Sequence, residues 1–110
     1  MTPTEKIAHL NDEARKGLLP GSTKVLLTPL VTALPEPLLL HLQDAVSQFD
    51  AFTEDNDPYG ERDFGAVEIE GERYFWKIDY YDRSLRFGAE DPSNVSETVR
   101  VMTLMHASEY

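Results

Sequence analysis

The chain contains no cysteine, so disulfide bonds, thiol catalysis and cysteine–zinc sites are all excluded. It also lacks a basic excess, because 20 acidic residues against 10 basic ones give a net charge of -10. A general binder of nucleic acid or of anionic membranes needs a basic face, so this balance argues against both classes. A phosphate-cradling glycine loop is missing too, since Gly60 and Gly65 alone do not form one.

Long hydrophobic runs are also absent. The most apolar stretch, residues 25–42, is interrupted by three prolines and a glutamate, which argues against a membrane-spanning helix. The first residues carry charges at Glu5, Lys6 and Asp12, where a secretory signal would be apolar. We therefore expect a cytoplasmic protein without membrane contact.

A length of 110 residues suits one domain that spans residues 1–110 and has one hydrophobic core. Its charge is unevenly distributed along the chain. Residues 1–49 hold five acidic and four basic residues, a balance of -1, whereas residues 50–110 hold fifteen and six, a balance of -9. The acidic character therefore belongs to the C-terminal half.

Two amphipathic helices and a strand are predicted in the first half. The first helix spans about residues 3–16 and begins with a capping box formed by Thr2 and Glu5. A short apolar run, Lys24–Thr28, predicts a strand. The second helix follows Pro37, and its apolar stripe consists of Leu39, Leu42, Val46, Phe49 and Phe52.

After a polar loop, Thr53–Asp63, the apolar period changes to two, which predicts a β-hairpin that turns at Glu70-Gly71. This turn places Glu68 opposite Arg73 and Val67 opposite Tyr74. The return strand is Glu72–Tyr81. We expect one of its faces to meet the helices through Tyr74, Trp76, Ile78 and Tyr80, while Phe75, Lys77, Asp79 and Tyr81 lie on the other face.

The C-terminal segment allows two interpretations. A turn at 82–84 and a short strand at Leu85–Phe87 come first, and Asn94 with Glu97 then resembles a helix start. We expect a helix from there to the C-terminus, although the continuously apolar run Val99–Leu104 also suits a strand. The predicted fold class is α+β: an antiparallel sheet, made of a central hairpin plus short strands, with about three helices packed largely on one face.

Several segments resemble one family of small bacterial proteins. They are Asn56–Gly65, Phe75–Asp82 and Thr98–Met105, together with Leu10-Asn11-Asp12 and Phe49-Asp50. From about Leu10 to Tyr110 the chain is similar to the family called domain of unknown function 3768. The resemblance implies no established activity. Similar members occur mainly in alphaproteobacteria, often on plasmids or other mobile elements, which implies a role such as antirestriction or CRISPR inhibition.

The polar loop invites two chemical interpretations. Asp55–Gly60 has the alternating oxygen groups of a calcium loop, but Ala66 stands where the closing glutamate is needed, so we expect an ordinary turn. Glu61, Arg62 and Asp63 could form a catalytic cluster with Asp79 or Asp82. We favour an Arg62–carboxylate bridge that pins the loop, and we expect no catalytic residue, metal or cofactor.

The leading hypothesis is a non-enzymatic acidic interaction protein. Its carboxylates would mimic a phosphate backbone and bind a protein partner with a basic surface, such as a nuclease or a CRISPR complex. The predicted partner-binding residues are Asp55, Asp57, Tyr59, Glu61, Arg62, Asp63, Phe75, Asp79 and Tyr81. Alternatives are a surface that only confers solubility, a second layer such as the N-terminal helix over the aromatic residues, a homodimer built on that sheet face, and a small enzyme with a Glu/Arg/Asp pocket.

Overall fold

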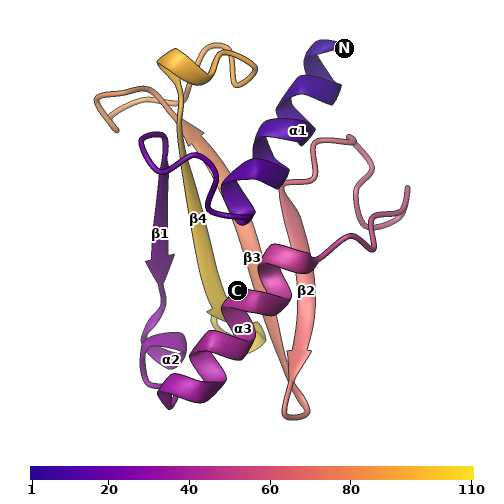
Figure 1. Cartoon of the computed structure of the whole chain (residues 1–110), viewed down its shortest axis with the longest axis vertical. Coiled ribbons are helices and arrows are strands. Elements are labelled where there is room, and N and C mark those ends of the chain that lie inside the picture. Colours follow the sequence, from indigo (N-terminus) through magenta and orange to yellow (C-terminus); the bar gives the residue numbers. More distant parts are fainter.

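The second half of the chain supplies three of the four strands of the sheet. In the computed structural model, which describes residues 1–110, the strands are β1 (Thr23–Leu27), β2 (Phe64–Ile69), β3 (Glu72–Tyr81) and β4 (Val99–His106). They lie in the order β1-β4-β3-β2 (Figure 1). Both pairs of the β2-β3-β4 unit are antiparallel and β1 runs parallel to β4, so the sheet is open and mixed, with antiparallel pairing dominant.

The hairpin between β2 and β3 confirms the predicted register. Glu68 pairs with Arg73 and Val67 pairs with Tyr74. Glu70 and Gly71 both have positive φ, 54° and 77°, which is the backbone of the two-residue turn whose twist matches that of the strands. Local turn chemistry therefore determines which side chains of both strands face the core.

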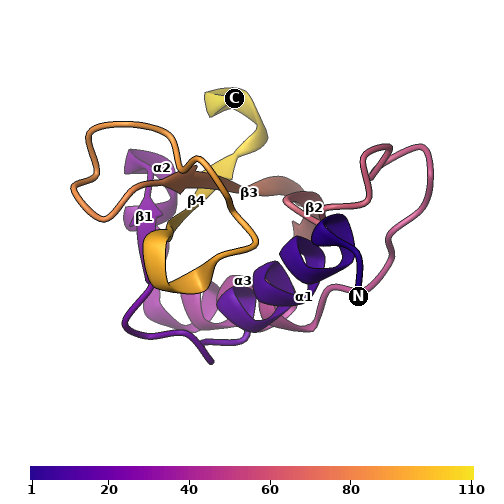
Figure 2. The ribbon, with the colours of Figure 1, turned by 90° about the horizontal axis from the view of Figure 1, so that it is seen from above.

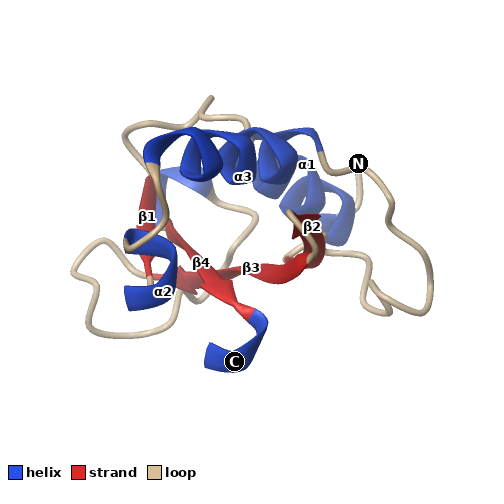
Figure 3. Ribbon diagram, turned by 90° about the horizontal axis from the view of Figure 1, so that it is seen from below, coloured by secondary structure: helices blue, strands red, loops and turns tan.

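The helices are α1 (Pro3–Arg15), α2 (Pro29–Thr32) and α3 (Glu36–Gln48). The capping box of Thr2 and Glu5 that we predicted at the start of α1 is present. Figures 2 and 3 show α1 and α3 side by side on one face of the sheet, as expected. The single turn of α2 was not predicted; it begins at Pro29, whose fixed φ suits the first position of a helix.

The prediction of a C-terminal helix is wrong, because Val99–His106 forms β4, one of the two inner strands of the sheet. Asn94 does act as a cap, but only for η1 (Val95–Glu97), one turn of 3₁₀-helix. Six of the eight residues of β4 are buried, which explains the continuous apolar run. A strand inside a sheet that is covered on both faces needs apolar residues at successive positions, so period two disappears from the sequence.

The short strand predicted at Leu85–Phe87 is also wrong. The Asp82 carboxylate accepts hydrogen bonds from the Ser84 hydroxyl (2.6 Å) and the Arg86 N–H (3.3 Å), which closes a local turn. Leu85 has a φ of 60°, outside the extended region. The segment therefore forms a loop, and one isolated bridge between Tyr81 and Gly88 is its contact with the sheet ladder.

The hydrophobic core fills the space between the sheet and α3. It contains Val31, Leu42, Val46, Ile69, Tyr74, Trp76, Ile78, Met102 and Leu104. Trp76 is fully buried and lies over Gly65, where a Cβ atom would come within 2.5–2.7 Å of the indole ring. Glycine at this position of β2 therefore leaves the space that the indole ring occupies.

None of the helices combines the length and the apolar character that crossing a membrane requires.

Candidate functional site

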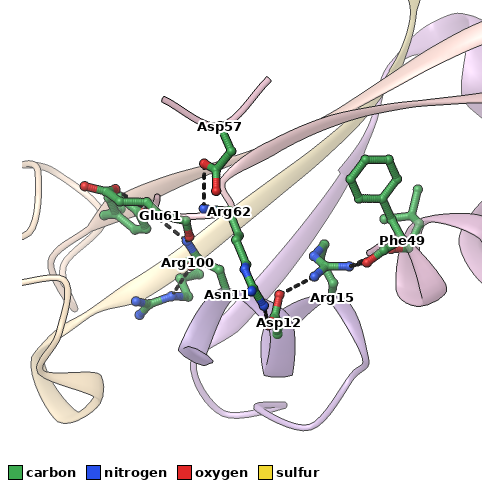
Figure 4. A network of polar contacts seen from close by, with 10 residues as sticks. Asn11, Asp12, Arg15, Phe49, Asp57, Glu61, Arg62 and Arg100 are labelled. Carbon is green, nitrogen blue, oxygen red and sulfur yellow. Dashed lines mark hydrogen bonds and ion pairs between the residues drawn. The ribbon is translucent and has the colours of Figure 1, made fainter. Parts of the chain in front are cut away.

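A buried arginine belongs to a polar network between α1 and the sheet (Figure 4). Arg100 of β4 is completely buried, although it belongs to the most strongly hydrated class of side chains. Its Nε donates to Asn11 Oδ1 at 2.7 Å and its Nη2 donates to the Pro92 carbonyl at 2.6 Å. Its guanidinium also lies 5.2 Å from the centre of the Tyr80 ring. Burial removes water from the charged guanidinium and so lowers the pKa of Arg100, and the nearby Tyr80 and Glu61 act in the opposite direction.

Asn11 of α1 extends this network to the end of the polar loop. Its Nδ2 donates to the Glu61 carbonyl at 2.9 Å and to the Tyr80 hydroxyl at 2.8 Å. The Tyr80 hydroxyl in turn donates to Glu61 Oε1 at 2.8 Å. Burial raises the pKa of Tyr80, and the neighbouring Glu61 carboxylate adds to the increase. The helix, the sheet and the loop are thus joined at one buried point.

A second part of the network is centred on Asp12. Its carboxylate accepts hydrogen bonds from Arg15 Nη2 and, at 2.6 Å, from Arg62 Nη1. Arg15 also donates to the carbonyls of Val46 and Phe49, both at 3.0 Å, at the C-terminal end of α3. The prediction that an Arg62–carboxylate bridge pins the loop is confirmed, and the carboxylate comes from α1.

The polar loop is ordered by its own side chains. Thr53 N–H donates to Asn56 Oδ1 at 2.8 Å, and Asn56 N–H donates to Thr53 Oγ1 at 3.2 Å. Asp57 Oδ1 accepts a hydrogen bond of 3.0 Å from the Arg62 N–H, where the backbone φ is 56°. The expected turn, in which Asp and Asn side chains bond the local backbone, is therefore present.

The structure divides the nine predicted partner-binding residues into two groups. The first comprises Asp55, Asp57, Tyr59, Glu61, Arg62, Asp63 and Asp79, which belong to the polar loop or lie beside its end. Tyr59 is 83% exposed. The pKa of Asp63 is raised by burial and by the nearby charges of Glu61, Asp57 and Asp79. These four carboxylates therefore form one acidic cluster.

The second group, Phe75 and Tyr81, lies on the sheet face away from α1 and α3, as predicted. Phe75 packs against Phe64 and Tyr110, with ring centres 5.2 Å and 5.4 Å apart. Tyr81 lines a hollow of about 310 Å³ together with Lys24, Leu26, Leu85 and Val101. The second layer that we considered comes from the C-terminal tail and from Leu85 rather than from the N-terminal helix.

A family model, Protein of unknown function (DUF3768), matches residues 27–109. The chain belongs to this family. Neither the search of curated proteins nor the search of solved structures found a match. The DUF3768 match begins after α1 and most of β1, later than the start near Leu10 that we expected. Arg100, Tyr80, Glu61 and Arg62 thus lie in the DUF3768 stretch, and their α1 partners precede it.

Three residues of the buried network were missed from the sequence of this DUF3768 chain: Asn11, Arg15 and Arg100. The sequence held a signal for Arg100 and for Asn11. Arg100 interrupts an apolar run, and Asn11 lies three or four residues from Ile7 and Ala14 on the buried face of α1. A polar residue at a core position indicates a partner, but its identity requires the tertiary structure.

The residues considered for a catalytic cluster are largely engaged in structural bonds. Glu61 accepts from Tyr80, and Arg62 is paired with Asp12. Arg62 lines two hollows, of about 300 Å³ and 420 Å³, that flank the loop. Neither hollow includes Glu61, Asp63 or Asp79. Asp82 lies apart from these residues and lines another hollow, of about 410 Å³, together with Arg83, Glu90, Asp91 and Glu97. Glu61, Asp63 and Asp79 therefore share none of these hollows with Arg62 or Asp82.

Proposed function

We propose that this protein is a non-enzymatic interaction protein that binds a basic surface of a protein partner through its polar loop, Thr53–Asp63. The observation that carries the proposal is the projection of this loop from the body of the molecule (Figure 2). Glu54 and Asp55 are exposed on it, and Tyr59 is 83% exposed. Exposed tyrosines are frequent anchors of interfaces, and surrounding carboxylates steer a basic partner toward them.

The anchoring of the loop supports the same function. Arg62 is bonded to Asp12 of α1, and Asp57 closes the turn by accepting from the Arg62 N–H. A loop held in one conformation loses little conformational entropy when a partner binds. These two bonds therefore favour binding, because they hold in place the loop that carries Glu54, Asp55 and Tyr59.

In its more specific form, the proposal is that a mobile element encodes this protein as an inhibitor of a host nuclease or CRISPR complex. The charge of residues 50–110, fifteen acidic against six basic residues, suits a mimic of nucleic-acid phosphates. Such a mimic would occupy the basic groove of the partner and compete with its nucleic acid.

The test is a variant with Glu54→Lys, Asp55→Lys and Tyr59→Ala, which changes exposed side chains outside the buried network. The matched control is Glu68→Lys with Glu70→Lys, an equal charge change at two exposed residues of the hairpin. Each protein is immobilised, and proteins retained from host lysate at low and high salt are identified. We expect the wild type and the control to retain a nucleic-acid-binding protein at low salt and to release it at high salt.

The loop variant should lose that partner by at least about tenfold, which corresponds to about 1.4 kcal/mol. The purified partner is then tested with its own nucleic acid as competitor, and competition supports the mimic. Equal losses in the loop variant and in the control would show general charge attraction and contradict a loop-specific site.

The alternative function is a small enzyme with a Glu/Arg/Asp pocket. One observation favours it, the raised pKa of Asp63 in the acidic cluster. A small-molecule screen by NMR on the wild type and on Asp63→Asn checks it. A ligand whose shifts centre on Asp63 and disappear in the variant would favour the enzyme over the interaction protein.

A further inference from the structure

The edge strand β1 has a free hydrogen-bonding side. Arg100 N–H donates to the Ser22 carbonyl at 2.8 Å, and Thr28 N–H donates to the Leu104 carbonyl at 3.2 Å. In a parallel pair, these bonds mean that the even-numbered residues of β1 point their backbone groups at β4. The backbone groups of Thr23, Val25 and Leu27 therefore point away from the sheet.

Hardly anything in the chain covers this side. The Leu27 carbonyl accepts a bond of 3.4 Å from the Thr32 hydroxyl, and β1 has no strand neighbour except β4. Val25 is 48% exposed and Leu26 is 53% exposed. Natural edge strands are normally protected by charges, prolines or bulges. Within β1, Lys24 is the one charged residue and there is no proline.

Hollows with apolar side chains lie on both faces of β1. On the face toward the helices, a hollow of about 180 Å³ is lined by Val25 together with Val46, Met102 and Leu104. On the opposite face, the hollow of about 310 Å³ is lined by Lys24, Leu26, Tyr81, Leu85 and Val101. An added strand places alternate side chains on the two faces, so its apolar residues would meet both hollows.

The opposite edge of the sheet differs in charge. Ile78 N–H donates to the Asp63 carbonyl at 2.8 Å, so the odd-numbered residues of β2 form the hydrogen bonds to β3. The backbone groups of Ala66 and Glu68 therefore point outward, away from the sheet. Glu68 is exposed there, and Glu70 follows at the turn. Two copies of a chain with a net charge of -10 repel each other at such a surface. At β1 this repulsion is lower, because the strand carries no acidic residue and Arg83 bonds to Gly21 and Ser22 just before it.

We propose that two copies of this chain associate by antiparallel pairing of their β1 strands, which would join the two sheets into one. A two-fold axis at Val25 places Val25 opposite Val25 of the second copy and Thr23 opposite Leu27. About six backbone hydrogen bonds can form in this register. Val25 and Leu26 of the second copy then lie beside the two hollows, so the same surface is complementary to itself.

This proposal does not depend on the proposed function, because the polar loop and β1 lie on different sides of the molecule (Figure 1). Its first test is the mass in solution, measured by sedimentation. We expect the wild type to have twice the monomer mass of 12.5 kDa. Val25→Pro removes a backbone N–H that pairing with β4 does not use. Leu26→Lys places a second positive charge opposite Lys24 of the other copy. Both should be monomeric, while Glu68→Lys on the other edge should stay dimeric.

The second test uses the absence of cysteine, which gives each single-cysteine variant one thiol. Mild oxidation should link Val25→Cys into a covalent dimer, because residues facing each other across a hydrogen-bonded pair have Cα atoms about 5.5 Å apart. Thr23→Cys should remain unlinked, since its two copies would be about 13 Å apart in this register.

Four results would overturn the proposal. One is a wild type that stays monomeric at a protein concentration of about 1 mM. A dissociation constant of that size corresponds to about 4 kcal/mol of binding free energy. Another is a dimer that survives in both β1 variants, which would place the interface elsewhere. Equal cross-linking of both cysteine variants would contradict the register. Growth into larger polymers would indicate pairing of β1 with β2 of another copy instead of a two-fold dimer.

Discussion

The helices α1 and α3 cover the same face of the sheet but are held there by different forces. On α3, the buried side chains are Leu42 and Val46, and both belong to the core around Trp76. On α1, the buried side chains include Asn11 and Arg15, and Asn11 bonds to the buried Arg100. The helix α3 is therefore attached by apolar packing, whereas α1 adds directional polar bonds to the apolar packing of Ile7, Ala8, Leu10 and Ala14.

This difference determines what each attachment can do. Apolar burial stabilises by about 1.5–3 kcal/mol per large side chain, and it tolerates small shifts in position. Buried hydrogen bonds add little net stability, but a buried polar group that loses its partner lowers stability strongly. Such bonds therefore favour one position of the helix over slightly shifted positions. The bonds from Asn11 and Asp12 reach Glu61 and Arg62, so the position of α1 is coupled to the polar loop.

The largest effect is expected when the apolar attachment is broken. Leu42→Ala should lower the free energy of unfolding by about 2–5 kcal/mol, because it leaves a cavity under α3. Denaturant unfolding measures this change. Leu40→Ala on the same helix is the control, since Leu40 is 56% exposed, and its effect should remain within about 0.5 kcal/mol. Equal effects of the two variants would contradict the core assigned to α3.

A smaller effect is expected from the polar attachment. Arg100→Met should lower the free energy of unfolding by about 2–3 kcal/mol, because Asn11 Oδ1 and the Pro92 carbonyl lose their donor while burial of a charge is relieved. Adding Asn11→Leu should cost less than the sum of the two single changes. The exposed Arg86→Met is the control. Strict additivity in this double-mutant cycle would show that the two residues are not coupled.

The smallest effect concerns the Tyr80 hydroxyl and depends on pH. Tyr80→Phe should cost about 1 kcal/mol at neutral pH through lost hydrogen bonds. The raised pKa of Tyr80 means that the folded state keeps a proton which the unfolded chain releases above about pH 10. The wild type should therefore lose stability as the pH rises through that region, and this contribution disappears in the variant.

Unfolding followed from pH 7 to pH 11 compares Tyr80→Phe with Tyr59→Phe, whose hydroxyl belongs to a side chain that is 83% exposed. The difference in the free energy of unfolding between the wild type and Tyr80→Phe should become smaller above pH 10. A constant difference across that range would mean that the Tyr80 hydroxyl ionises equally in the folded and unfolded states.

Prediction from sequence succeeded where the signal was local. The capping box at Thr2 and the hairpin turn at Glu70-Gly71 depend on residues within a few positions of one another, and both are present. The pinning of the loop by Arg62 was also predicted. Its partner Asp12 was not, because the two residues are 50 positions apart and only the docking of α1 brings them together.

The C-terminal strand shows the limit of local signals. The cap at Asn94 is real but serves a single 3₁₀ turn, and the apolar run after it suits a helix or a strand. The strand is favoured because β1 and β3 satisfy the backbone of β4 on both sides, while six of its eight residues are buried. Hydrogen bonds between distant segments outweigh a helix-start signal of about 1 kcal/mol.

The acidic character, the α+β class, the hairpin register and the family resemblance could be predicted, because each depends on composition or on neighbouring residues. The position of β4 between β1 and β3 and the bond between Arg100 and Asn11 of α1 became known from the folded chain. The fold also leaves one side of β1 open. These features depend on which distant segments form backbone hydrogen bonds or buried polar contacts with each other. Each such contact is stable only within the whole fold.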